Sequence, residues 1–201
     1  MRSEKFKVIN IRDYLIDDDE KIGEEGLRKK LSDFTCPLNL NVEEFLKQKS
    51  IEFTKRNQSV TYLVFLDDAS TLVGYFTLAS KSITVKEGIL SKTIQKKVSR
   101  VSEYESENQT FRLSAYLIAQ LGKNFTDNAN KRITGHQLLE LAIQKVKELQ
   151  YMLGGTIVFL EAKPHEKLME FYTKQHSFKE FDTRQAYSKE DGELVQLLGT
   201  L

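Results

Sequence analysis

The residues from Arg132 to Gln137 are the part of the sequence whose types and spacing could hold a charged ligand. They read Arg-Ile-Thr-Gly-His-Gln and open a segment with helical periodicity. The first turn of a helix presents unpaired backbone N–H groups and the positive end of the helix dipole, and both favour a phosphate. Gly135 lets an anion approach the backbone, and Lys131 adds charge. Taken locally, the pattern fits either a phosphate site or an ordinary basic helix start.

The elements around this junction are a long strand and the clearest helix of the chain. Residues 111–121, FRLSAYLIAQL, read as a strand, and apolar residues recur at helical spacing from Ile133 to Tyr151. Gly154 and Gly155 end that helix. Residues 156–160, TIVFL, form a continuous apolar run, as expected of a strand buried on both faces.

The other segments complete a mixed α/β chain. Residues 59–66 and 71–78 are rich in β-branched and aromatic residues around a short polar turn, which predicts a hairpin. Four further helices are expected: one within 17–31, one from Asn41, one from Ile89 and one after Pro164. In the second, Asn41 would be the N-cap and the core-facing residues would be Val42, Phe45, Leu46 and Phe53; in the third, one face would carry Ile94, Val98 and Val101. Strands are expected near 83–85, 178–181 and 194–198. No linker or repeat divides the chain, so we expect residues 1–201 to form a single domain.

Charge gives a first indication of the partner. The 201 residues include 30 basic and 29 acidic ones, and 40% of the chain is hydrophobic, as in a globular protein. A protein that grips many phosphates usually has a basic excess, so the whole-chain charge argues against a nucleic-acid partner. A local basic patch stays open as an alternative. Its members would be Lys92, Lys96, Lys97 and Arg100.

Several classes of site and compartment are disfavoured. Cys36 is the only cysteine, which excludes an internal disulfide and a multi-cysteine metal site. The three histidines, His136, His165 and His176, lack partners at metal-ligand spacing, so no metal is expected. No stretch approaches the roughly 20 apolar residues of a membrane helix, and residues 1–10 lack the apolar core of a signal peptide. We therefore expect a cytoplasmic protein with no membrane partner.

The pattern at 132–137 resembles the acetyl-CoA loop of the GNAT N-acetyltransferases, written Q/R-x-x-G-x-G/A. Arg132 and Gly135 match it, whereas Gln137 stands where the motif has glycine or alanine and Ile133 replaces a frequent glycine. Further segments resemble the family's strands and its A-x-x-F-Y-x-x-x-G-F segment: Thr61–Val64, Leu72–Ala79, Leu117–Gly122, Met169–Tyr172 and Ser177–Phe178. The resemblance spans roughly Cys36 to Leu201.

This resemblance implies a fold, a co-substrate and a set of binding residues. The fold would be the GNAT-like acyl-CoA N-acyltransferase fold, an α/β fold with a central, mostly antiparallel sheet, helices on both faces and a splayed parallel pair. Acetyl-CoA would be the co-substrate. Its pantetheine arm would pair with the backbone of Leu121, Gly122 and Lys123, and its pyrophosphate would meet Arg132 and the backbone amides of Ile133, Thr134, Gly135, His136 and Gln137.

Tyr172 falls where the family often has a tyrosine near the CoA sulfur, which implies a role as general acid toward the departing thiolate. Phenols and thiols titrate at roughly pH 10 and 8.5, so proton transfer between them is feasible. A general base is harder to find. The segment that resembles the family's fourth strand, around Leu117–Gly122, offers Tyr116 and Gln120 but no carboxylate. Glu161, at the end of the next strand, is the remaining candidate.

The sequence thus predicts an N-acetyltransferase that transfers acetyl from acetyl-CoA to a primary amine by direct attack. The missing base favours an α-amine, which titrates at roughly 7.7–8.0, over a lysine amine near 10.4. Within the family, Phe34-Thr35-Cys36, Asn39, Phe45-Leu46 and Gly74-Tyr75-Phe76 resemble the bacterial toxin-like members, whose acceptor is aminoacyl-tRNA. A non-catalytic CoA-binding or partner-binding module is the alternative from another class, and a homodimer stays open.

Overall fold

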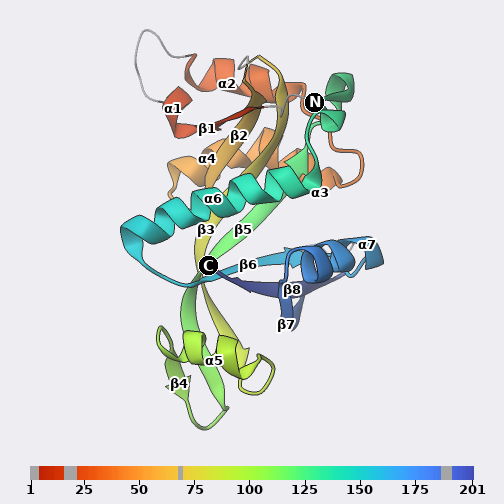
Figure 1. Cartoon of the computed structure of the whole chain (residues 1–201). Helices are drawn as coiled ribbons and strands as arrows, with labels where there is room; N and C mark the ends of the chain where they lie inside the picture. The colour runs from red at the N-terminus through yellow and green to blue at the C-terminus, as the bar shows by residue number, and fades with distance from the viewer. Residues whose placement is uncertain (1–4, 16–21, 68–69, 187–191) are drawn as a thin grey trace. The chain divides into compact units, whose positions relative to one another are not determined.

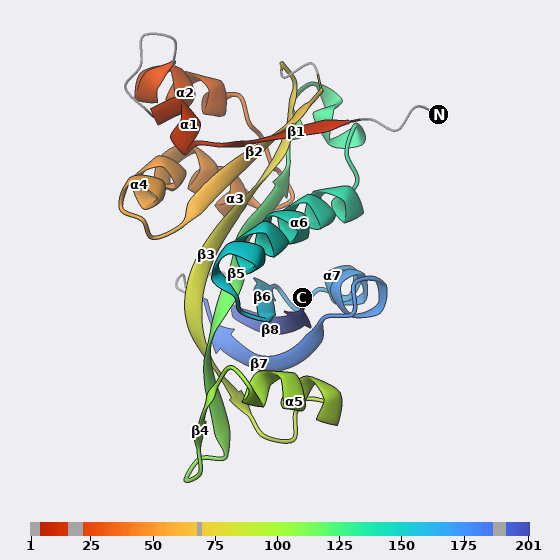
Figure 2. The same cartoon turned by 60° about the vertical axis from the view of Figure 1, so that its left-hand side comes forward.

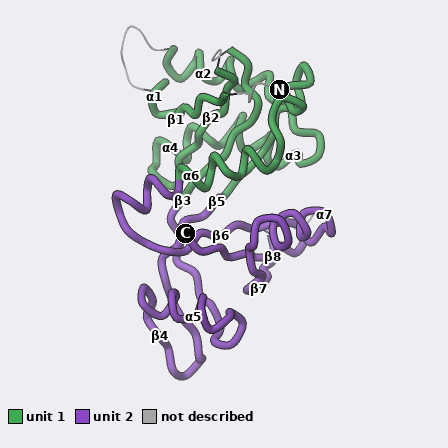
Figure 3. The backbone as a smooth tube through the Cα atoms, in the orientation of Figure 1, with its two compact units in different colours: residues 1–79, 119–145 green, residues 80–118, 146–201 purple. Residues whose placement is uncertain are grey.

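The computed structural model describes residues 5–15, 22–67, 70–186 and 192–201 (Figure 1). The chain divides into two compact units (Figure 3). Unit 1 comprises Met1–Ala79 and Ala119–Lys145, and unit 2 comprises Ser80–Ile118 and Val146–Leu201. Two strands, β3 (Leu72–Lys86) and β5 (Thr110–Lys123), and the helix α6 (Gly135–Leu153) contribute residues to both units.

Unit 1 is built on antiparallel strands. β1 (Phe6–Asn10) pairs with β2 (Val60–Leu66), and β2 pairs with β3, with Val64 opposite Gly74. The helical elements before β2 are α1 (Arg12–Leu15), α2 (Gly23–Ser32), α3 (Leu40–Glu44), a π-helical turn at Phe45–Lys49 and α4 (Ser50–Lys55). Within this unit, α1–α4 lie on one side of the strands and the first part of α6 lies on the other (Figure 2).

The core of unit 1 joins the helices to β2 and β3. Its buried members include Leu27, Leu31, Phe34, Leu46, Ile51, Leu63, Phe65 and Tyr75. Phe34 and Tyr75 meet edge to face with ring centroids 5.3 Å apart. The hydroxyl of Tyr75 donates to the carbonyl oxygen of Val42 at 2.5 Å, so the one polar atom of this buried ring has a partner. Burial raises the pKa of Tyr75 well above its ordinary value.

Two glycines allow the close packing at the end of β5. A Cβ on Gly122 would lie 2.4 Å from Cγ1 of Val42, and a Cβ on Gly74 would lie 2.8 Å from the carbonyl oxygen of Gly122. Real Cβ atoms do not approach other heavy atoms so closely, and overpacking a core costs about 1–3 kcal/mol. The backbone of β5 therefore fits between α3 and β3 only with glycine at these positions.

Unit 2 contains the excursion between β3 and β5 and the C-terminal strands. The excursion holds α5 (Lys92–Ser99) and β4 (Glu103–Glu105), which pairs with the start of β5. β6 (Ile157–Ala162) pairs in parallel with β5 at three positions, Tyr116–Ile118 with Val158–Leu160. β8 (Glu193–Thr200) pairs antiparallel with β6 and with β7 (Lys179–Gln185), and the helical segment before β7 comprises α7 (Glu166–Met169) and a π-helical turn at Glu170–Gln175.

The strand order is β1-β2-β3-β5-β6-β8-β7. Among the described residues, β5 and β6 pair in parallel, whereas β1–β2, β2–β3, β6–β8 and β7–β8 pair antiparallel. This confirms the predicted mixed α/β class, the hairpin, the long strand and the long helix. The single-domain prediction is not tested by the two units and stays a prediction. No described helix is long and apolar enough to cross a membrane.

Several local predictions were wrong. The helix after the Pro37 loop begins at Leu40 with Asn39 as N-cap, not Asn41. Phe53 is 37% exposed and Val101 is 43% exposed, so neither faces a core. β1 was not predicted, because it has only five residues, FKVIN, too few to carry a clear periodic signal. For the helix expected within 17–31, residues 17–21 lie outside the described residues, and α2 covers Gly23–Ser32.

Candidate functional site

The end of β5 and the loop that follows it belong to unit 1. Leu121 and Lys123 are half-buried and Gly122 is buried. The ammonium group of Lys123 donates to the carbonyl oxygens of Asn130 at 3.0 Å and Ile133 at 3.3 Å. The side chain thereby ties the strand end to the start of the predicted phosphate loop. The structure thus brings together two of the segments that the sequence predicted to share one ligand.

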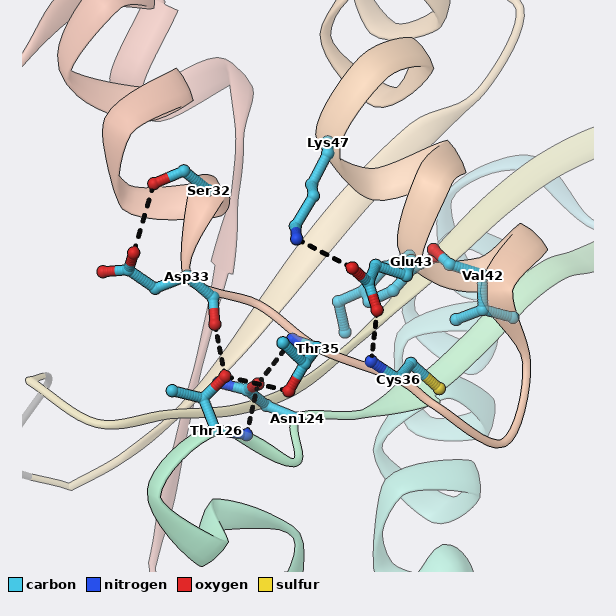
Figure 4. Close-up of polar contacts among 10 residues, drawn as sticks. Ser32, Asp33, Thr35, Cys36, Val42, Glu43, Lys47, Asn124 and Thr126 are labelled. Carbon is cyan, nitrogen blue, oxygen red and sulfur yellow. Dashed lines mark hydrogen bonds and ion pairs between the residues drawn. The ribbon is translucent and has the colours of Figure 1, made fainter.

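Asn124, the residue after β5, holds this strand end by hydrogen bonds, and no sequence motif indicated its role. The side-chain oxygen of the buried Asn124 accepts hydrogen bonds from the backbone N–H groups of Thr35 at 3.1 Å and Thr126 at 3.2 Å. Its amide nitrogen donates to the carbonyl oxygen of Leu72 at 2.9 Å. Figure 4 shows the side chain at the meeting point of β5, the loop after it and the segment that follows α2.

Neighbouring contacts extend this polar network. The backbone N–H of Phe125 donates to the carbonyl oxygen of Thr35 at 2.8 Å, and the hydroxyl of Thr126 donates to the carbonyl oxygen of Asp33. On the other side of Thr35, the N–H of Cys36 donates to the carboxylate of Glu43 at 2.8 Å (Figure 4). The segment after α2 is therefore fixed to both β5 and α3 by hydrogen bonds.

The first turn of α6 carries a reciprocal cap that the sequence analysis missed. The backbone N–H of Thr134 donates to Oε1 of Gln137 at 2.9 Å, and the N–H of Gln137 donates to the hydroxyl of Thr134 at 3.1 Å. This is the Ser/Thr-x-x-Glu/Gln capping box. The spacing Thr134-Gly-His-Gln137 could have revealed it. Gln137 therefore replaces the family's small residue with a side chain that occupies one of the predicted phosphate donors.

The other residues of the loop differ in their surroundings. Ile133 is 1% exposed, so its side chain anchors the loop in the core and points away from any ligand. Within the described part of the chain, no partner is found for the backbone N–H groups of Ile133 and Gly135. The side chain of Arg132 is exposed, and the imidazole of His136 lies 3.8 Å from the carboxylate of Glu140. The start of α6 thus combines these two backbone N–H groups with an exposed cation.

An open groove of about 880 Å³ lies in unit 1 beside this loop. Its walls come from the end of α2, the start of β3 and the loop from Asn124 to Arg132. The residues that line it are Lys30, Ser32, Asp33, Phe34, Thr35, Ser70, Thr71, Leu72, Asn124, Thr126, Asp127, Asn128, Ala129, Lys131 and Arg132. Hydroxyl, amide and charged groups dominate these walls, so the groove suits a polar ligand.

Tyr172 belongs to unit 2 and lies in the π-helical turn after α7. Its ring packs edge to face against Phe171, with centroids 5.0 Å apart, and against Phe178, with centroids 6.1 Å apart. Burial raises the pKa of Tyr172 to about 12. Among the described residues, no hydrogen bond to its hydroxyl is found, and burial alone accounts for the shift of its pKa. A neutral phenol with an uncommitted hydroxyl is suited to donate a proton or a hydrogen bond.

Glu161 is committed to other groups. Both carboxylate oxygens accept from the guanidinium group of Arg184, with Nε 2.7 Å from Oε1, and Gln196 donates to Oε1 at 2.7 Å. Burial raises the pKa of Glu161, but the hydrogen bonds from Arg184 and Gln196 outweigh it, so the pKa lies below the ordinary value. A carboxylate held in this way is a weak base, so the structure argues against the catalytic role considered for Glu161.

Two other residues considered as bases or metal ligands, Tyr116 and His176, are engaged in other contacts. The hydroxyl of Tyr116 donates to the carbonyl oxygen of Gly154, and burial raises the pKa of Tyr116. The imidazole of His176 packs on the ring of Phe171, with centroids 4.6 Å apart. Among the described residues, no group of three or more histidine, cysteine or carboxylate side chains has the proximity of a metal site.

No family model and no curated protein matches the sequence, but solved structures do. One is AtaT complexed with acetyl-methionyl-tRNAfMet, 18% identical over 95% of this chain and 94% of that chain, with a TM-score of 0.62. A tyrosine-to-phenylalanine mutant of KacT is 19% identical over 98% and 95% of the two chains, with a TM-score of 0.60. AtaTR bound with AcCoA is 15% identical over 97% and 92%, with a TM-score of 0.54.

The chain has the GNAT N-acetyltransferase fold. The match covers nearly the whole of each chain and confirms the predicted fold. At identities below a fifth, it shows the fold alone. The roles of individual residues therefore have to be argued from the contacts of this chain.

We predict that Asn124→Ala destabilises the protein by roughly 2–4 kcal/mol, because it leaves buried backbone groups at Thr35, Thr126 and Leu72 without their partners. The measurement is urea unfolding followed by circular dichroism. Asn130→Ala, in the same loop, is the matched control, because only the backbone of Asn130 accepts from Lys123. Equal stability of the two variants would show that Asn124 is not the clamp.

Proposed function

We propose that this protein transfers an acetyl group from acetyl-CoA to the α-amino group of an aminoacyl-tRNA. The observation that carries the proposal is the junction of β5 and α6. There, a strand end held by Asn124 leads into a helix start that has backbone N–H groups beside the exposed side chain of Arg132. Two similar structures support the two halves of the reaction: AtaTR is bound with AcCoA, and AtaT is complexed with acetyl-methionyl-tRNAfMet.

The residues present fit the polar parts of acetyl-CoA. The N–H groups of Ile133 and Gly135 and the guanidinium group of Arg132 would meet the pyrophosphate, together with the positive end of the α6 dipole. Lys123 adds a positive charge behind the loop. In β5, the parallel ladder with β6 ends at Ile118, well before Lys123, so backbone groups near the strand end are suited to pair with the pantetheine arm.

The chemistry asked of the protein is modest. The amine nitrogen attacks the thioester carbonyl carbon, the C–S bond breaks, and the amine proton leaves to water. Tyr172 would donate its phenolic proton to the departing thiolate and recover one from solvent. With a pKa of about 12, Tyr172 is a weaker acid than a free phenol. Burial also disfavours the thiolate and raises the pKa of the CoA thiol, which reduces the difference in pKa between the phenol and the thiol.

The type of acceptor amine is inferred from the lack of an evident general base. Glu161 is neutralised by Arg184, and the described part of β5 carries no carboxylate. An α-amine titrates at roughly 7.7–8.0 and is partly neutral near pH 7.5, whereas a lysine amine near 10.4 needs a base. An amino acid esterified to tRNA offers an α-amine of this kind. This argument favours aminoacyl-tRNA over a protein lysine.

The acceptor class is tested by competition between two peptides, one with only an α-amine and one with only a lysine amine. We expect acetylation of the α-amine, because the protein need not deprotonate it. Mass spectrometry of the products gives the ratio. Preference for the lysine would show that a base has been missed, and binding of acetyl-CoA without release of CoA would favour the non-catalytic module.

A second prediction concerns Gln137. Gln137→Ala removes the side chain that accepts from the N–H of Thr134, so that N–H becomes available to a phosphate. We expect tighter binding of acetyl-CoA by calorimetry, together with a loss of about 1 kcal/mol in stability of the free protein because half of the cap is lost. Arg132→Glu is the opposite variant and should weaken binding. Weaker binding by Gln137→Ala would place the phosphate elsewhere.

A third prediction concerns Tyr172 and pH. Because its pKa is raised to about 12, the phenol of Tyr172 stays protonated throughout the range up to pH 10. The rate should therefore rise as the acceptor amine loses its proton near pH 8 and should show no decline up to pH 10. Tyr172→Phe should lower kcat by roughly 10²-fold or more without changing the binding of acetyl-CoA. Phe171→Leu controls for packing. An unchanged kcat would make Tyr172 a core aromatic only.

A further inference from the structure

Helix α5 carries an unbalanced positive face. Its sequence, KTIQKKVS, contains no acidic residue, and Arg100 follows it directly as the C-cap. The side chains of Lys92, Lys96, Lys97 and Arg100 are exposed, whereas Val98 on the other side is fully buried. Within the described residues, none of the four cations makes an ion pair, and Lys97 contacts only the hydroxyl of Thr200, at 3.5 Å.

Several cations on other helical segments are paired with an acid one turn away. Arg28 pairs with Glu24 at 2.7 Å, Lys47 with Glu43 at 2.8 Å and Lys174 with Glu170 at 2.6 Å. Such pairs stabilise a helix slightly and cancel its charge. In a chain whose 30 basic and 29 acidic residues nearly balance, the concentration of cations on α5 is therefore local.

Two acids near α5, Glu87 and Glu105, form hydrogen bonds with other groups. Glu87 accepts from the side-chain amide of Gln95 at 3.0 Å and from the hydroxyl of Tyr104 at 2.6 Å. Glu105 accepts from the hydroxyl of Thr110 at 3.3 Å. These two carboxylates are held by neutral donors and not by the cations of α5.

The side chains of this positive face surround a shallow, open space. A depression of about 480 Å³ is lined by Lys92, Thr93, Lys96, Lys97 and Arg100 and by no apolar side chain. Protein partners usually need a buried apolar centre, whereas a phosphate backbone needs only spaced cations and hydroxyls. Lys92, Lys96 and Arg100 follow one another at four-residue intervals, about 6 Å apart along the axis, so each can meet a separate phosphate.

We propose that this basic face of α5 binds the phosphate backbone of the RNA that carries the acceptor amine. The inference rests on the proposed function, since it assigns to that RNA a place on unit 2. It also accounts for a nearly neutral protein acting on a polyanion, because the contacts come from one local surface. The bound groups are phosphates and not bases, so the face should bind RNA with little sequence preference.

The test uses the full-length protein and fluorescein-labelled unacylated tRNA, with binding followed by anisotropy across a salt series. The triple variant Lys92→Gln, Lys96→Gln, Arg100→Gln should bind at least tenfold more weakly and lower the slope of log K against log salt by about 2–3. The control variant Arg28→Gln, Lys49→Gln, Lys174→Gln removes the same charge from cations that are already paired with acids. It should bind like the parent.

Turnover separates this inference from the proposed function. With an amino-acid methyl ester as acceptor, which has no phosphate, the triple variant should keep its kcat/KM, whereas with aminoacyl-tRNA its kcat/KM should fall at least tenfold. If neither acceptor is acetylated, the proposed function fails, and the anisotropy data still decide the inference. Equal binding by the triple and control variants would overturn it. So would a patch-dependent affinity for polyglutamate that exceeds the affinity for tRNA at the same salt concentration.

Discussion

The hydrogen bonds of Asn124 hold the end of β5, and the rest of the candidate site depends on where that end lies. A single buried amide joins the segment after α2, the start of β3 and the loop before α6. Gly122 and Gly74 let the same strand pass within contact of Val42 and of the neighbouring backbone. The helix start that offers N–H donors to an anion is therefore positioned by contacts made some ten residues earlier along the chain.

The long elements could be predicted from the sequence because their periodicity is strong. The apolar repeat of α6, the run that forms β6 and the hairpin of β2 and β3 each follow from local pattern. The polar contacts could not. Asn124 bonds to Thr35, 89 residues away, and Glu161 of β6 bonds to Arg184 of β7 across the intervening strand β8. Neither pairing leaves a local signature. The cap of Thr134 and Gln137 is the exception, since its four-residue spacing was visible and was attributed to a phosphate motif alone.

These contacts change how the chemistry is shared between enzyme and acceptor. Glu161 is locked to Arg184, so the protein supplies no evident base, and the buried Tyr172 keeps its proton up to high pH. A protein of this kind would bind and align two reactants and assist the leaving thiolate. The acceptor would have to bring a reactive amine. The nearly neutral charge of the chain fits this division, provided that a phosphate-bearing acceptor is met by a local surface such as α5.

The central claim is tested most directly by following the acetyl group itself. The protein is incubated with acetyl-CoA labelled with ¹³C in the acetyl group and with a pool of aminoacyl-tRNAs. The tRNA is then digested with nuclease, and the terminal aminoacyl-adenosines are analysed by mass spectrometry. The proposed function predicts labelled N-acetyl-aminoacyl-adenosine in amounts equal to the CoA released. Release of CoA with the label on no aminoacyl-adenosine, or no release at all with acetyl-CoA bound, would contradict it.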